Sequence, residues 1–127
     1  MDRKVIVPEG TDASALPFSP AIQTGQMVYL SGTAGLGKDG KVPGPDIVSQ
    51  ARQAMENLGE ALFAAGSSWD KVVKANCFLT HAARDFAGWN QVWKEYFAKN
   101  PPARTTVGMP LLNEEWLIEV NLIAYVD

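Results

Sequence analysis

Two charged residues, Arg104 and Glu119, have side chains that can do chemistry together. Each stands in a run rich in β-branched or apolar residues, 103–109 and 116–126, of the kind that forms strands. A guanidinium presents a planar fork of N–H donors that fits a substrate carboxylate, and a nearby carboxylate can position or activate water. The pair therefore suits a reaction in which an acid is bound and water is delivered to it.

The companions of these two residues follow from strand periodicity. Alternate side chains of a strand share a face, so Arg104 lies with Thr106, and Glu119 lies with Asn121. Ser31 joins them if its own strand is adjacent. The alternative is that these side chains only solvate the open side of an antiparallel sheet.

Cys77 and His81 suggest a second chemistry, a nucleophile with its base. Both lie in or just after a predicted strand, 72–80, where positions four apart are about 13 Å distant and cannot share a hydrogen bond. We therefore expect Cys77 to be a small core residue and His81 to lie on the surface. The chain has one cysteine and one histidine, which excludes an intrachain disulfide and argues against a zinc site.

The segment 35–41, GLGKDGK, matches two phosphate-binding patterns, G-x-G-x-x-G and G-x-x-x-x-G-K. A phosphate-binding loop leads directly into a helix, whereas Val42, Pro43 and Gly44 follow here. Val42 also replaces the Ser or Thr that such a loop places after its lysine. We therefore interpret the segment as a loop rich in Gly and Pro.

The remaining elements follow from hydrophobic periodicity and from Gly and Pro. Asp46 and Gly66 mark the start and stop of one amphipathic helix, and Asp85 is expected to cap a second helix that ends at Pro101. The aromatic stripe of that second helix is expected to pack in the core: Phe86, Trp89, Trp93, Tyr96 and Phe97. The predicted strands are 4–7, 27–33, 72–80, 103–109 and 116–126. This order predicts an α+β fold, a mixed sheet with two helices on one face.

The last strand also predicts what covers the sheet. One row of alternate side chains is wholly apolar and is expected to face the helices: Trp116, Ile118, Val120, Leu122, Ala124 and Val126. The opposite row is Leu117, Glu119, Asn121, Ile123 and Tyr125. Its apolar members would form an exposed patch in a monomer, so this face predicts self-association.

Size and composition limit the remaining possibilities. The 127 residues suit a single domain, 1–127, and a formal net charge of −3 lacks the basic excess expected for nucleic-acid or membrane binding. The N-terminus meets Pro8 and acidic residues early, so we expect neither a signal peptide nor a membrane span. The expected location is the cytoplasm.

Several sequence blocks resemble the RidA/YjgF family, also known as the liver perchloric-acid-soluble-protein type, over nearly the whole chain. The blocks occur in the family's order: GQMVYLSG at 25–32, QARQAMENLGEALFAAGSSWDKVVKANCFLT at 50–80, DFAGWNQVWKEYF at 85–97, PARTTV at 102–107 and IEVNLIAYV at 118–126. The resemblance implies a chorismate-mutase-like α+β fold, a homotrimer with clefts between subunits, and hydrolysis of enamines or imines to ketoacids and ammonia. It implies no metal or organic cofactor.

The resemblance also implies roles for single residues. Arg104 would bind the substrate carboxylate, and Glu119 would orient the water that attacks the imine carbon. Further residues match positions that line the cleft or support it: Ser31, Asn90, Thr105 and Thr106.

Three positions depart from the family's pattern. Phe18 stands where the best-known deaminases have a tyrosine, Asn121 replaces an acidic residue, and TTVGM continues the Arg104 strand. These differences leave the substrate open between 2-aminoacrylate, a larger acid such as an aminomuconate-like one, and an enamine from a catabolic pathway. Two other functions also stay open, namely carboxylate binding without catalysis and the ribonuclease activity attached to some members, which an acidic chain favours less.

Overall fold

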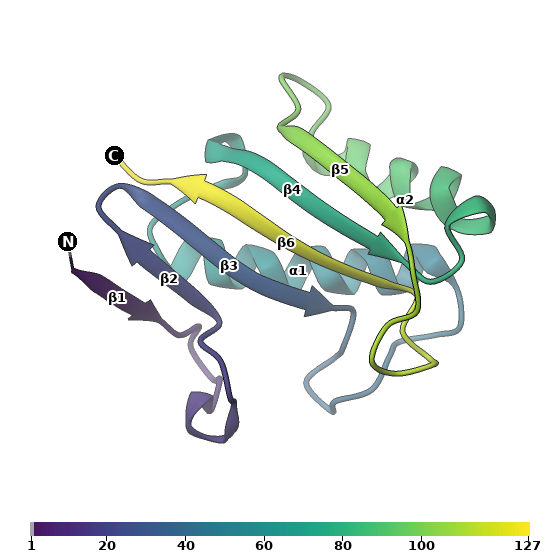
Figure 1. Ribbon diagram of the computed structural model, residues 1–127, viewed down its shortest axis with the longest axis horizontal. Coiled ribbons are helices and arrows are strands. Elements are labelled where there is room, and N and C mark those ends of the chain that lie inside the picture. The colour runs from purple at the N-terminus through teal and green to yellow at the C-terminus, as the bar shows by residue number, and fades with distance from the viewer. Residues whose placement is uncertain (1) are drawn as a thin grey trace.

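Residues 2–127, which the computed structural model describes, form a six-stranded sheet with two α-helices packed on one face (Figure 1). The strand order is β1-β2-β3-β6-β4-β5, and only β4 and β5 are parallel. The elements are β1 (Arg3–Ile6), β2 (Ala21–Thr24), β3 (Met27–Ala34), α1 (Ile47–Ala64), β4 (Val72–Leu79), α2 (Ala82–Tyr96), β5 (Ala103–Gly108) and β6 (Ile118–Tyr125). The mixed sheet with its helices on one face confirms the predicted α+β architecture.

Helix α1 begins and ends where its sequence predicts. The Asp46 carboxylate accepts the Ser49 backbone N–H at 2.9 Å, which satisfies one of the free donors of the first turn. Gly66 follows the helix with a φ of +81°, a left-handed conformation that glycine adopts without steric cost. The apolar stripe of the helix is buried against the sheet, with Met55, Leu58 and Leu62 almost wholly inaccessible.

Helix α2 corrects the prediction that Asp85 is its cap. The helix begins at Ala82 with His81 in the capping position, and Asp85 is a buried residue whose carboxylate accepts two hydrogen bonds from Arg84. The earlier start accompanies a tertiary contact, because Thr80 is hydrogen-bonded to the two residues just before β6. Its N–H donates to the Leu117 carbonyl at 3.1 Å, and the chain turns directly into the helix from there.

The sequence prediction missed β2. Thr24 pairs with Met27, so Gly25 and Gln26 alone make the turn, and Gly25 has a φ of +58°. Such two-residue turns favour glycine where φ is positive, so Gly25 was the available signal for a hairpin. Without β2, the prediction placed no strand between β1 and β3, although the register pairs both of them with it.

The two faces of the sheet differ as β6 predicts. Ile118, Val120, Leu122 and Ala124 are buried beneath the helices, whereas Tyr125 on the opposite row is exposed. Leu117 was predicted to lie in the strand, on its uncovered row, and this is wrong. It precedes β6 and is buried, and its N–H donates to the Gln50 side chain at 2.8 Å. We call the uncovered side the open face. It carries further exposed aromatic and aliphatic side chains, Tyr29 and Val107 among them.

Candidate active site

Arg104 lies on β5, the strand at one edge of the sheet, and its side chain points toward α2. The register pairs Arg104 with Ala75, a fully buried residue of β4, which places it in the row that faces the helices. Nη1 donates to Asn90 Oδ1 at 2.8 Å, and the guanidinium carbon lies 4.8 Å from the ring centre of Trp93 and 5.5 Å from that of Phe86. These contacts fix the guanidinium, because one hydrogen bond and two aromatic rings restrict its rotation.

The guanidinium still has donors to offer. Among the described residues, Asn90 is its only hydrogen-bond partner, and no carboxylate lies within ion-pair distance. Arg104 also lines a pocket of about 440 Å³ together with Asn90, Trp93 and other residues of α2 and the segment after it. A fixed cation with free N–H groups at the wall of a pocket is the arrangement that binds a carboxylate.

Behind Arg104 lies a small buried cluster of polar atoms. Trp89 Nε1 and Thr106 Oγ1 are buried without an oxygen or nitrogen partner in the described part of the chain. Both adjoin the thiol of Cys77, and burial raises the pKa of that thiol to about 11, an effect that the positive charge of Arg104 partly offsets. Cys77 is thus a buried, protonated thiol at neutral pH, which confirms the prediction that it is a core residue. His81 is exposed at the start of α2.

Glu119 lies on β6 and points to the open face. It pairs with Phe78 of β4 and with Ala34 of β3, next to an irregularity between Leu30 and Thr33 that inserts one extra residue into β3. A Cβ atom on Gly32 would lie 2.5 Å from Glu119 Oε2, so the carboxylate occupies the space that a side chain at position 32 would take. Within residues 2–127, no side chain or backbone group forms a hydrogen bond with this half-buried carboxylate.

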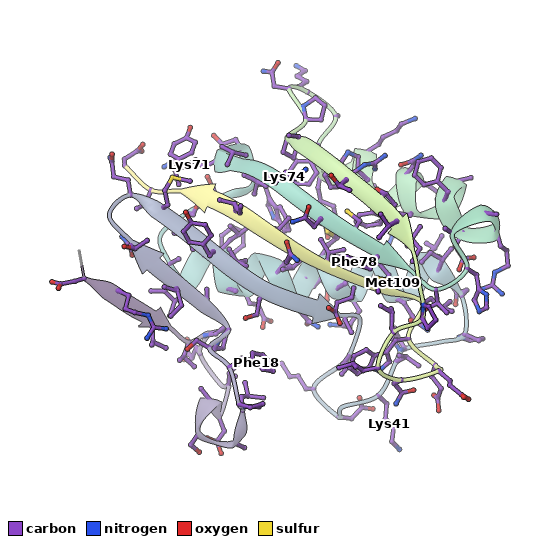
Figure 2. The ribbon with its side chains drawn as sticks, in the orientation of Figure 1. Phe18, Lys41, Lys71, Lys74, Phe78 and Met109 are labelled. Carbon is purple, nitrogen blue, oxygen red and sulfur yellow. The ribbon has the colours of Figure 1, made fainter. Side chains whose placement is uncertain are left out.

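Ser31 and Phe18 lie near the same bulge. Ser31 Oγ donates to the Ser19 carbonyl at 2.6 Å, and the Ser31 N–H donates to the Pro20 carbonyl at 2.9 Å. The two bonds hold the segment that follows Phe18 against β3, while Phe18 itself is 52% exposed. In Figure 2, Phe18 lies in the connection between β1 and β2, away from the labelled Lys74 and Phe78 of β4.

Thr105 differs from its two neighbours because it faces the open side. Its hydroxyl accepts a hydrogen bond from Lys74 Nζ at 2.8 Å. Beside it, Asn76 donates to Asn121 at 2.9 Å. The open face therefore carries a polar stripe across β5, β4 and β6 that leads toward Glu119.

The predicted site residues thus fall into two separate groups. The strand periodicity is confirmed, since Arg104 shares a face with Thr106, and Glu119 shares one with Asn121. The alternative that both pairs only solvate the open side of the sheet is wrong for Arg104 and Thr106, which face the helices. The cause is the register between β4 and β5, which sets Arg104 beside Ala75 and which no local sequence pattern specifies.

Three residues of the candidate site were not assigned to it from the sequence. Trp93 and Phe86 were expected in the core. Trp93 is buried there as predicted, whereas Phe86 is 42% exposed, and both rings flank the guanidinium. The helical spacing of Phe86, Asn90 and Trp93 was the available signal, because side chains three and four positions apart share one face. Gly32 was also missed, and its signal was a glycine inside a strand, which marks a bulge or a close approach.

Two further observations concern what the described residues can hold. No helix among residues 2–127 is long and apolar enough to cross a membrane. In the same range, no three His, Cys, Asp or Glu side chains are grouped closely enough to bind a metal ion.

Comparison with known proteins decides the family. The family model described as "Endoribonuclease L-PSP" matches residues 10–126. The chain belongs to this family, the RidA/YjgF family. A mouse protein named 2-iminobutanoate/2-iminopropanoate deaminase is 36% identical over 123 residues, with 96% of this chain and 90% of the mouse chain covered. The mitochondrial protein mmf2 of Schizosaccharomyces pombe is 45% identical over 112 residues, with 85% of this chain and 86% of its own covered.

A solved structure of the family agrees with the fold. The crystal structure of the YjgF gene product from E. coli matches with a TM-score of 0.86 at 31% identity. The match covers 96% of this chain and 98% of the E. coli chain. The resemblance seen in the sequence blocks is thereby confirmed at the level of family and fold, and relatives within the family are named as imine deaminases.

Proposed function

We propose that this protein hydrolyses reactive enamine or imine carboxylates to ketoacids and ammonia, in a cleft formed where two subunits meet. The observation that carries the proposal is the division of the site, with a fixed cation on the helix side of β5 and a free carboxylate on the open face. The name of the mouse relative supports the same reaction class.

The division of the site supports a cleft between subunits. Arg104 and Glu119 lie on opposite faces of one sheet, so a small substrate cannot touch both within a single chain. Arg104 stands on the edge strand, where the open face of another copy can reach it. The exposed side chains of that face, Tyr29 and Tyr125 among them, supply apolar surface for the contact.

Closed rings of identical subunits use such contacts, in which one surface patch meets a different one on the next copy. We therefore expect a homotrimer with three equivalent clefts. Light scattering at micromolar concentration measures the oligomer directly. A trimer is the expected mass, and a monomer would contradict the cleft.

In this cleft Arg104 holds the substrate carboxylate in paired hydrogen bonds, while Asn90 and Trp93 keep the guanidinium in place. Glu119 of the neighbouring copy orients a water molecule and accepts a proton as the water oxygen attacks the imine carbon. Glu119 returns this proton to the imine nitrogen, which gives a carbinolamine. The hydroxyl proton of the carbinolamine then passes to its nitrogen through Glu119 as the C–N bond breaks, which releases ammonia and leaves the ketoacid. An imine carbon is electrophilic, so positioning and proton transfer supply the catalysis.

The position of Phe18 bears on the substrate. Its ring offers no hydroxyl contact, in contrast to the tyrosine of the best-known deaminases. This difference, together with Asn121 in place of an acidic residue of the family pattern, favours a carboxylate substrate other than 2-aminoacrylate. The expected cytoplasmic location stays a prediction, since one relative is named as mitochondrial.

Three assays on one preparation test the proposal. Ammonia release is measured from imines generated in situ by an amino-acid oxidase, beside RNA cleavage and calorimetry with small ketoacids. Ammonia release above the uncatalysed rate, abolished or strongly slowed in Glu119→Gln, is the expected result. Ketoacid binding without turnover would instead support a carboxylate-binding protein, and RNA cleavage without ammonia release would support the activity that the family description names.

A further inference from the structure

The pocket beside Arg104 extends well past the guanidinium along α2. Asn90, Trp93, Lys94 and Phe97 line it, at the three- and four-residue steps that put side chains on one face of a helix. Pro101, in the segment that leads to β5, closes another side. The site therefore has room beyond the atoms that Arg104 and Glu119 would hold.

The volume of the pocket exceeds what the smallest substrates need. It measures about 440 Å³, within the range of roughly 300–1,000 Å³ typical of sites for much larger ligands. A three-carbon imino acid bound at Arg104 would occupy only part of this volume, which is measured on the single chain. The unused wall is largely apolar, with the rings of Trp93 and Phe97 in tilted contact at a centroid distance of 4.4 Å.

The charges of the pocket have one sign. Arg104 and Lys94 line it, and no acidic residue does. The carboxylate next in sequence, Glu95, is engaged by Arg52 at 2.7 Å, and no described carboxylate lies within ion-pair distance of Lys94. Such a wall suits a ligand with an anionic group at each end and an apolar middle.

We propose that the substrates of this protein are imino acids whose side chain ends in a second anionic group, which Lys94 binds while Arg104 binds the α-carboxylate. The proposal rests on the proposed deaminase function for the reaction, but its binding geometry can be tested alone. Lys94 lies one helical turn beyond Asn90, about 5–6 Å along the axis.

Ketoacids, the products of the reaction, serve as probes. Calorimetry compares 2-oxobutanoate, which has one carboxylate, with 2-oxoglutarate and 2-oxoadipate, which have two. The wild type is expected to bind the two dicarboxylates more tightly. Lys94→Gln should lower that preference about fivefold, the size of an exposed ion pair, and Lys94→Glu should lower it further.

Lys99→Gln is the matched control. Lys99 is exposed on the segment between α2 and β5 but does not line the pocket, so its loss changes the net charge equally and should leave the preference unchanged. Added salt should weaken the wild-type preference, because it screens the contact with Lys94. Circular dichroism checks that each variant is folded.

The same preference is then measured as ammonia release from imines of 2-aminobutanoate and 2-aminoadipate. A dicarboxylate preference that Lys94→Gln reduces and Lys99→Gln keeps supports the subsite. A wild type without the preference, or equal effects of the two variants, overturns it even if imines are hydrolysed. Conversely, selective binding of 2-oxoadipate with no ammonia from any imine would refute the deaminase function and leave the subsite standing.

Discussion

The two groups of site residues differ in how the chain holds them. On the helix side of β5, Arg104 is fixed by a hydrogen bond from its guanidinium to Asn90 and by the ring of Trp93. On the open face, Glu119 lies over Gly32 with no hydrogen-bond partner among the described residues. In the cleft that we propose, each subunit supplies the carboxylate-binding half from the helix side of β5 and the proton-accepting half from its open face. Binding and catalysis should therefore respond to different mutations.

The largest effect is expected on the binding side, from Arg104→Lys. Lysine keeps the charge but loses the planar fork, and a charge-assisted bidentate contact is worth about 2–3 kcal/mol. We expect kcat/KM for imine hydrolysis to fall on the order of a hundredfold while the trimer persists. Steady-state ammonia release and light scattering measure both quantities. Unchanged kinetics for every substrate would contradict the assigned role of Arg104.

Gly32→Ala tests the other half. The new Cβ would lie 2.5 Å from Glu119 Oε2, so the carboxylate must move. We expect kcat to fall at least tenfold, roughly 1.4 kcal/mol, while ketoacid binding changes little. The control is the double mutant Gly32→Ala/Glu119→Gln. If Gly32→Ala acts by displacing the Glu119 carboxylate, adding it to Glu119→Gln should lower kcat little further, because the effects of residues in contact are not additive. Full additivity of the two changes would argue that Gly32 acts independently of Glu119.

A smaller effect is expected from Asn90→Leu, which removes the acceptor of Arg104 Nη1 and keeps a similar volume. One hydrogen bond to a charged group contributes about 1.5–3 kcal/mol when both partners are buried, and less here because both residues are only half-buried. We expect roughly a tenfold rise in the Kd for ketoacids, read by calorimetry. Gln91→Leu, one position along on the exposed side of α2, is the control and should leave this Kd unchanged.

Cys77 gives the smallest expected effect on activity, because its thiol is buried and protonated. Cys77→Ala should keep most turnover, and loss by orders of magnitude in a folded variant would restore the nucleophile hypothesis. The pH dependence of stability is a sharper test, since burial raises the pKa of the thiol from 9.0 to about 11. As pH rises through 9 the unfolded chain loses this proton while the folded chain keeps it until about 11.

The thiol therefore contributes its full stabilisation below pH 9, and that contribution is lost as pH rises to 11. The loss amounts to about 2–3 kcal/mol relative to a chain without the group. Urea unfolding of wild type and Cys77→Ala across this range isolates the thiol, because all other groups are common to both proteins. Parallel curves for the two proteins would show that the thiol does not titrate with a shifted pKa.

The sequence predicted those features that depend on local pattern. The caps of α1 at Asp46 and Gly66 and the alternation along β6 are encoded in neighbouring residues, and the structure confirms them. The side to which Arg104 points depends on how β5 pairs with β4, a contact between segments about 30 residues apart that a local pattern does not record. The start of helix α2 at Ala82 likewise follows a hydrogen bond between distant segments, from the Thr80 N–H to the Leu117 carbonyl.

The central claim, that each site combines Arg104 of one subunit with Glu119 of another, is tested most directly by mixing two inactive variants. Arg104→Lys and Glu119→Gln chains with different tags are co-expressed, and trimers carrying both tags are purified. A cyclic trimer with both kinds of chain contains one cleft that pairs an intact Arg104 with an intact Glu119. We therefore predict recovery of about one third of wild-type ammonia release. Mixed trimers no more active than their inactive parents would contradict the shared site.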